Sequence, residues 1–434
     1  MKHVIILVFG AALLISCASH KNKTAYGAGW SAVHADAGNS DYSSVKGGRQ
    51  VSLLWHKKFG GTVNLGPTTD SKGRVYVTTS APGCHLFALD ARSGKELWCT
   101  DRVNKFAVAS SALIDKDNRL FIADDTAMYA FDEQGNLLWK YPIKGFPLSA
   151  QFTHTGRLLF ITHIGNVYVL ERKTGAPLIN GQPLSPEPFS HSSFNPVACM
   201  KGTADCPCAN TLAYDLGTGR FFFTYWQPGT SGASLWAMQY TEQSNTASVS
   251  RLWENNALPG GSASSPDISA DGKKIYVNDN SGSLYALNSA TGEIVWRYSL
   301  GFNPGGSQST SPDGYIMPSG ANGAALMCLK DEGDSARLVW RTDTLVNRGV
   351  AAQTAGHLAY ATVASNRDRF YNDLLVVDVR TGKVLDRKSL SEKTFFTVGT
   401  TIGPEGNIYV PSFNGHLYAF KSRHPFFPTS NLHP

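Results

Sequence analysis

Short runs of alternating apolar and polar residues recur along most of this chain, separated by polar turns that contain glycine. In the copy beginning at Ser283, the run SLYALN is followed by the turn SATG and a second run that ends at Trp296. Alternation with a period of two predicts β-strands, and the short turn predicts an antiparallel hairpin. Close copies begin at His85 and Ala127, and weaker ones begin at Asn166, Leu235, Ala325, Asp373 and His416.

Two further strands precede each hairpin. One is a short apolar run such as RVYV at 74–77 or KIYV at 274–277, and the other is a segment of small residues such as 110–113, 264–266 or 398–401. The unit is therefore a four-stranded blade. The turns that open the second strand lie at Gly73, Asn118, Gly156, Gly219, Gly272, Gly314, Gly356 and Gly406. They define eight units with a mean spacing of about 48 residues, the period of a β-propeller blade.

The last unit lacks an outer strand, whereas an isolated strand, VSLLW at 51–55, precedes the first unit. We therefore expect an all-β, eight-bladed β-propeller of four-stranded antiparallel blades, in which this N-terminal strand completes the last blade. Such closure removes exposed strand edges and predicts a monomer. A long β-sandwich or two stacked all-β domains are the alternatives, but they do not explain the period.

The best copies of the motif, LYALN followed by a Thr-Gly turn and Trp, resemble the pyrroloquinoline-quinone-type (PQQ-like) propeller repeat. The resemblance covers about residues 48–421 and leaves a tail at 422–434; blades three, four and seven match it less well. The tryptophans at 55, 98, 139, 253, 296 and 340 occupy the blade-motif position, where packing between blades accounts for them. An insertion at about 183–214 interrupts the repeat, and long loops on a rigid scaffold often carry recognition.

The N-terminus predicts export. A lysine at position 2, an apolar run from Val4 to Ile15 and the sequence LISC resemble a lipoprotein signal of residues 1–16, with Cys17 as the lipidated residue. An ordinary cleaved signal is the alternative. Residues 17–47 would then form a tether and lead-in, flexible from about 18 to 29. The absence of Asp after Cys17 implies, by resemblance to lipoproteins, the periplasmic side of the outer membrane.

Six further cysteines remain in a compartment that permits disulfides. Cys84 and Cys99 flank the first hairpin almost symmetrically, which predicts a disulfide. Cys199, Cys206 and Cys208 cluster in the insertion with His191 nearby, where a loop-stapling disulfide is favoured over a zinc site. Cys328 replaces the small residue of the blade motif, which predicts a buried, unpaired thiol.

Residues just before the blade turns should face the central axis. These axial candidates are Thr68, Ser110, Ser111, Gln151, Ser265, Asp267, Gln308, Gln353 and Thr400. Most are uncharged hydroxyls and amides, suited to binding water or a polar ligand but offering little acid–base chemistry. His163 and the segment DKDN at 115–118 are interpreted as turn residues rather than metal ligands.

Two classes of function remain. The LISC sequence, the predicted fold and the length resemble those of the BamB lipoproteins of the outer-membrane barrel assembly machinery. This resemblance implies a non-enzymatic, membrane-anchored scaffold that binds a protein partner, with no catalytic residue and no cofactor. The alternative is a PQQ-dependent dehydrogenase with calcium, or a ligand-binding propeller that uses its axial funnel. The dehydrogenases typically carry a disulfide between adjacent cysteines, and no Cys-Cys pair exists here. The net charge of +6 without a basic run speaks against nucleic-acid binding.

Overall fold

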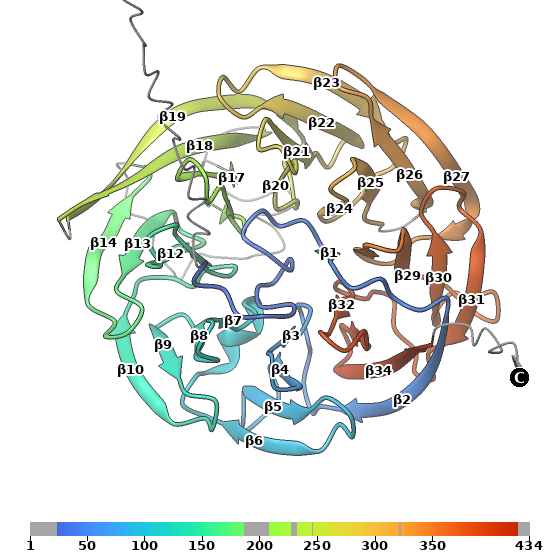
Figure 1. Ribbon diagram of the computed structural model, residues 1–434, viewed down its shortest axis with the longest axis horizontal. Helices are drawn as coiled ribbons and strands as arrows, with labels where there is room; N and C mark the ends of the chain where they lie inside the picture. The colour runs from blue at the N-terminus through green and yellow to red at the C-terminus, as the bar shows by residue number, and fades with distance from the viewer. Residues whose placement is uncertain (1–23, 186–207, 227–231, 245, 321–322, 424–434) are drawn as a thin grey trace, which may run out of the picture.

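The chain is an eight-bladed β-propeller. The computed structural model describes residues 24–185, 208–226, 232–244, 246–320 and 323–423. These residues form eight sheets arranged as blades around a central axis (Figure 1), which confirms the predicted fold class. A 3-10 helix at Lys105–Ala109 interrupts the strands. No helix of the described residues has the length and apolar character needed to cross a membrane.

The first seven blades place their four strands in chain order from the axis outward, and the eighth takes its outermost strand from the N-terminal part of the chain. From blade one to blade eight, the innermost strands are β3 (Thr68–Thr69), β7 (Leu113–Ile114), β11 (Gln151–Phe152), β15 (Cys208–Ala209) with β16 (Ala213–Tyr214), β20 (Asp267–Ile268), β24 (Gln308–Thr310), β28 (Ala352–Thr354) and β32 (Thr401–Ile402). The second strands are β4 (Arg74–Thr78), β8 (Leu120–Ala123), β12 (Leu158–Ile161), β17 (Arg220–Trp226), β21 (Lys274–Asn278), β25 (Tyr315–Pro318), β29 (Leu358–Ala364) and β33 (Ile408–Ser412).

The third strands are β5 (Leu86–Asp90), β9 (Ala127–Phe131), β13 (Asn166–Leu170), β18 (Gly232–Gln243), β22 (Ser283–Asn288), β26 (Ala325–Asp331), β30 (Asn372–Asp378) and β34 (His416–Arg423). The outer strands are β6 (Glu96–Thr100), β10 (Leu137–Pro142), β14 (Pro177–Pro183), β19 (Thr246–Pro259), β23 (Ile294–Ser299), β27 (Ala336–Val346), β31 (Val384–Ser389) and β2 (Gln50–Lys58). Because the strands alternate in direction, the first-to-second and third-to-fourth connections share one face of the ring, the turn face. The remaining connections form the opposite loop face.

The ring closes through the N-terminal strand, as the sequence predicts. β2 pairs antiparallel with β34, with Gln50 opposite Arg423 and Trp55 opposite Ala419. The last blade therefore has its fourth strand from the other end of the chain. Pairing also extends β34 to Arg423, two residues past the predicted boundary of the propeller.

The motif tryptophans join neighbouring blades. The indole of Trp98 donates to the carbonyl of Glu133 in the next blade (3.0 Å), and Trp55 donates to that of Ala91 (3.0 Å) across the closing seam. A Cβ added at Gly135 would lie 2.7 Å from the Trp98 ring, and this glycine has a φ of +86°. The glycine of the turn thus supplies both the backbone conformation and the space on which the indole packs.

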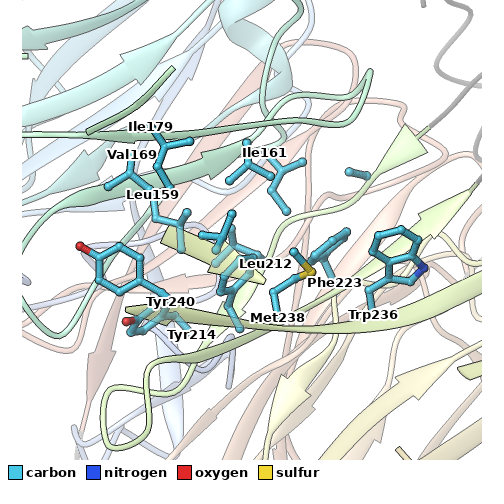
Figure 2. Close-up of a cluster of buried hydrophobic side chains, with 14 of the residues drawn as sticks. Leu159, Ile161, Val169, Ile179, Leu212, Tyr214, Phe223, Trp236, Met238 and Tyr240 are labelled. Atoms are coloured by element: carbon cyan, nitrogen blue, oxygen red, sulfur yellow. The ribbon is translucent and has the colours of Figure 1, made fainter. Parts of the chain in front are cut away.

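The seam between blades three and four is built differently, because β14 lacks a tryptophan. Aliphatic side chains of blade three meet the aromatic side chains of β17 and β18 in a buried cluster (Figure 2). Arg157 and Glu242 form an ion pair across the same seam (2.6 Å). Bulk packing and an ion pair therefore replace the indole contact where the repeat is least regular.

Candidate functional site

Residues 24–47, the lead-in, run through the centre of the ring (Figure 1). They enter at the turn face, where Lys116, between β7 and β8, donates its amide to the Ala25 carbonyl (2.8 Å). Gly27 donates its amide to Ile114 in blade two (2.9 Å), and Thr69 in blade one donates to Trp30 (2.9 Å). The Tyr26 hydroxyl bonds Gln151 of blade three (2.7 Å). Residues 25–29, which the sequence predicted to be part of a flexible tether, are therefore bonded to the ring, and Ala25 is buried.

The lead-in then turns back toward the turn face along the remaining blades. Backbone amides of the inner strands donate to its carbonyls, at 2.6 to 3.0 Å, in four successive blades. These bonds run from Tyr214 to Ala37, Ile268 to Gly38, Thr310 to Ser40, and Gln353 to Asp41. β1 (Tyr42–Ser43) completes the path by pairing in parallel with β28. The segment thereby caps inner-strand groups that a hollow axis would leave to water.

A tight reversal lets this segment fit inside the ring. Ala35, Asn39 and Asp41 have positive φ values of 72°, 62° and 47°. Asn tolerates this region, whereas alanine is strained there. Hydrogen bonds hold the reversal, because Ser40 donates both its amide and its hydroxyl to the carboxylate of Asp36. The hydroxyl of Ser40 also accepts from the amide of Tyr42 (3.2 Å).

The nine axial candidates lie around the axis but are covered rather than open. Each is at most 5% exposed. Gln151 donates to the Asp36 carbonyl (3.2 Å) and to Asn39 (2.9 Å) of the lead-in. Several others bond neighbouring blades, as Thr68 does through Ala112 (2.8 Å). The complete set is Thr68, Ser110, Ser111, Gln151, Ser265, Asp267, Gln308, Gln353 and Thr400.

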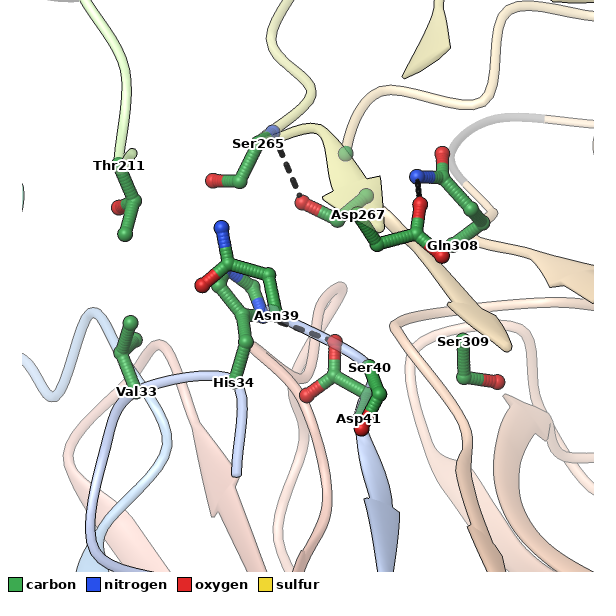
Figure 3. Close-up of polar contacts among 12 residues, drawn as sticks. Val33, His34, Asn39, Ser40, Asp41, Thr211, Ser265, Asp267, Gln308 and Ser309 are labelled. Carbon is green, nitrogen blue, oxygen red and sulfur yellow. Dashed lines mark hydrogen bonds and ion pairs between the residues drawn. The ribbon is translucent and has the colours of Figure 1, made fainter. Parts of the chain in front are cut away.

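A buried polar network forms where the lead-in meets blades five and six (Figure 3). His34 bonds the carboxylate of Asp41 (2.8 Å). Burial lowers the pKa of His34, but the charge and hydrogen bond of Asp41, with Asp36, outweigh it and raise that pKa overall. Asp267 accepts hydrogen bonds from Gln308 and Thr310. Burial nevertheless raises the pKa of Asp267 well above its usual range.

No periodic pattern in the sequence marks His34, Asp36 or Asp41. They lie outside the repeat, and only the fold brings them to the axis. The sequence pattern identified Asp267 as the carboxylate of the inner strands. The lead-in adds the carboxylates of Asp36 and Asp41 nearby. His163 is a buried loop residue that stacks on Phe146 (4.1 Å). Asp115 accepts from the amides of its own turn and from Arg172 (2.9 Å), as a turn residue does.

The lead-in forms the floor of an open funnel of about 780 Å³ on the turn face. Its walls are the turns of blades four, five and six, at 214–218, 268–272 and 310–312. The carboxylates of Asp215 and Asp271 each accept hydrogen bonds within their own turns. The funnel therefore offers a polar surface whose carboxylates already have local partners.

The cysteines divide into three groups. Cys84 and Cys99 are joined by a disulfide with Cα atoms 5.7 Å apart. Cys328 is a buried free thiol, and burial raises its pKa. Cys199, Cys206 and His191 lie outside the described residues, as does Cys17, and Cys208 is described only as a residue of β15.

The residues at the axis do not fit a quinone with calcium. The lead-in occupies the axial space, and the aromatic side chains of the funnel are the tyrosines Tyr26, Tyr42 and Tyr214 rather than an indole platform. Within the part of the chain that the structure describes, no cluster of three or more His, Cys, Asp or Glu side chains is arranged to hold a metal. We derive no chemistry through either group.

Relatives with similar sequences share about a quarter of their aligned residues with this chain. Protein Rv3035 of Mycobacterium tuberculosis is 28% identical over 403 residues, covering 90% of this chain and 95% of its own. The outer membrane protein assembly factor BamB of Moranella endobia is 26% identical over 254 residues, or 55% of this chain and 58% of that protein. The match to the second relative thus spans just over half of each chain.

Solved structures share the fold. A europium-containing methanol dehydrogenase superposes with a TM-score of 0.64 at 15% identity, over 91% of this chain and 98% of that one. BamB from Moraxella catarrhalis gives 0.58 at 14%, over 86% and 99%. An enzyme and an assembly factor match about equally well, so these likenesses describe architecture alone. The family described as outer membrane protein assembly factor BamB matches residues 46–196 and 229–425, and this protein belongs to that family.

Proposed function

We propose that this protein is an exported lipoprotein, anchored through Cys17, that serves as a non-enzymatic scaffold for a protein partner in outer-membrane protein assembly. The observation that carries the proposal is the filled axis. The N-terminal segment bonds blades one to seven and occupies the centre of the ring. The surface loops therefore remain as the regions available for recognition. The family match supports the assembly role.

Cross-linking in native membranes followed by affinity purification tests this role. We expect the full chain to recover a component of the barrel assembly machinery, and Cys17→Ser to lose membrane association while the ring stays folded. Recovery of no assembly component would remove the proposed role. Membrane association by the Cys17→Ser chain equal to that of the natural chain would remove the lipid anchor.

The funnel favours a second candidate, binding of a small polar ligand at the turn face, because its volume of about 780 Å³ is that of a ligand site. Titration of the purified protein with the quinone and calcium, followed by absorbance, separates the two classes. Stoichiometric uptake would replace the scaffold proposal with a cofactor-binding one.

A further inference from the structure

Three exposed phenylalanines lie together on the loop face of blades seven and eight. Phe370, Phe396 and Phe413 are 44%, 37% and 47% exposed. The amide of Phe413 donates to the Phe396 carbonyl (3.3 Å), and the amide of Thr394 donates to the Phe370 carbonyl (2.7 Å). These bonds tie three separate loops into one surface. We call these phenylalanines, with Arg348 and Arg369, the aromatic–cationic patch.

Arg348 is buried in this patch without a counter-ion. It is 4% exposed, and its guanidinium lies 4.2 Å from the centre of the Phe395 ring. Its Nε and Nη1 atoms have no hydrogen-bond partner among the described residues. Burial lowers the pKa of Arg348, and the positive charge of Arg369 lowers it further. The patch thus holds two neighbouring cations, one of them desolvated.

The other buried arginine among the described residues is paired. Arg172, 8% exposed, bonds the carboxylate of Asp115 (2.9 Å) between blades two and three, although its Nε also lacks a hydrogen-bond partner. The half-buried Arg74 bonds both Asp70 (2.7 Å) and Glu133 (2.6 Å). Burying a charge without a partner is costly. Leaving Arg348 without a carboxylate therefore adds no stability to the fold, which points to a carboxylate that arrives from outside.

We infer that the aromatic–cationic patch docks an acidic segment of a partner protein, whose carboxylate reaches Arg348 while its apolar side chains pack among the three phenylalanines. Arginine and aromatic side chains dominate the binding energy of protein interfaces. This inference rests on the proposed scaffold function and names the surface that would perform it.

A protein segment fits this site better than an anionic membrane. Arg348 is only 4% exposed, so the planar headgroup layer of a membrane cannot surround its guanidinium. The patch is also on the loop face, whereas the lead-in enters at the turn face. Six residues lie between Cys17 and Thr24, so these two residues are at most about 25 Å apart. A lipid on Cys17 would therefore hold the turn face toward the membrane and leave the patch facing away.

Thermal unfolding of two arginine variants shows whether the charge of Arg348 serves binding or folding. We expect Arg348→Met to raise the midpoint of thermal unfolding, because it removes an unpaired buried charge and keeps the side-chain volume. Arg172→Met, the matched change at a paired arginine, should lower the midpoint. A lower midpoint for Arg348→Met would assign Arg348 to the fold and overturn the inference.

Binding is tested on the full chain with a labelled peptide of repeating Glu-Phe-Asp-Leu units. We expect anisotropy to show binding that salt weakens, and that Arg348→Met or the double change Phe370→Ser and Phe413→Ser weakens about tenfold. Lys273→Gln, an exposed cation on the turn face, should bind like the natural chain. Equal binding by all variants, or no binding by the natural chain, would overturn the inference.

Two further measurements keep the failures apart. A Lys-Phe-Lys-Leu peptide should not bind, and phosphatidylglycerol vesicles should not compete. Competition by vesicles that depends on Arg348 would make the patch a lipid site and overturn the protein assignment. If membrane cross-linking finds no assembly component while the acidic peptide binds through Arg348, the patch stands and only the proposed assembly role fails.

Discussion

The seams between blades repeat one side-chain contact, whereas the lead-in meets the blades through backbone bonds and through side-chain contacts that each occur once. At most seams an indole packs on the turn glycine of the next blade and donates to a carbonyl, as Trp98 does at Gly135 and Glu133. Along the axis, Tyr26 uses its hydroxyl, Ala37 its carbonyl and Asn39 its amide. A repeated contact leaves a pattern in the sequence, and a set of single contacts leaves none.

Removal of the axial segment tests this contrast most severely. Deletion of residues 24–43 removes the hydrogen-bond partners of seven ring amides, those of Thr69, Ile114, Lys116, Tyr214, Ile268, Thr310 and Gln353. At about 1 kcal/mol for each bond, we expect the free energy of unfolding to fall by about 7 kcal/mol. Urea denaturation measures the change. A chain that begins at residue 24 is the control and should match the full chain. Unchanged stability after the deletion would mean that residues 24–43 contribute nothing to the stability of the ring.

The closing seam gives the next largest effect. Trp55→Ala empties the contact between blades eight and one and should cost about 3 to 5 kcal/mol. Trp55→Phe keeps an aromatic ring and loses mainly the bond to the Ala91 carbonyl, so it should cost about 1 kcal/mol. The same denaturation curves compare the two. Equal losses would mean that the hydrogen bond, rather than ring packing, holds the seam.

The disulfide of blade one strengthens a single hairpin rather than a seam. Cys84 and Cys99 are separated by 15 residues, so replacing both with serine should cost about 3 kcal/mol. A reducing agent should destabilise the natural chain by a similar amount and leave the double variant unchanged. If reduction shifts both chains equally, another thiol pair accounts for the effect. The seam variants should keep their rank under either condition.

Sequence alone predicted the ring well, because blades repeat. The period of the turn residues gave eight blades, and the unmatched strand at 51–55 gave the closure that β2 and β34 display. Gly356 is the informative exception among the turn positions, since the positive φ belongs to His357. The turn keeps its shape there but is displaced by one residue. A rule that places the turns at glycines does not detect this displacement.

The axis was predictable only in part. The inner-strand side chains were predicted from their place before the turns. The segment that covers them was not predicted, because VHADAGNSD at 33–41 and its neighbours carry no apolar period. Contacts between residues more than a hundred positions apart, such as Tyr26 with Gln151, decide whether an axis is open. Arg348 could not be predicted for the same reason, because the structure is needed to show that a charge has no partner.

The last effect depends on pH and comes from Asp267, the carboxylate that both regions share. Asp267 belongs to blade five and lies under the lead-in, fully buried. Burial raises its pKa, and the charges of Asp41 and Asp36 raise it further, against the hydrogen bonds of Thr310 and Gln308. A folded-state pKa above the unfolded value stabilises the fold at low pH, and that stability is lost as pH rises through the folded value.

Asp267→Asn removes this titration while its amide can still bond Gln308 and Thr310. Near pH 4 the two chains should have similar stability, and toward pH 8 the variant should gain about 1.4 kcal/mol for each pKa unit of the shift. Asp271→Asn, in the exposed turn of the same blade, is the matched control. Burial raises the pKa of Asp271, but bonds from Ser269 and Lys273 lower it overall, so its stabilising effect grows as pH rises. Opposite slopes would show that the axis and the turn face hold carboxylates in opposite ways, and parallel slopes would contradict this.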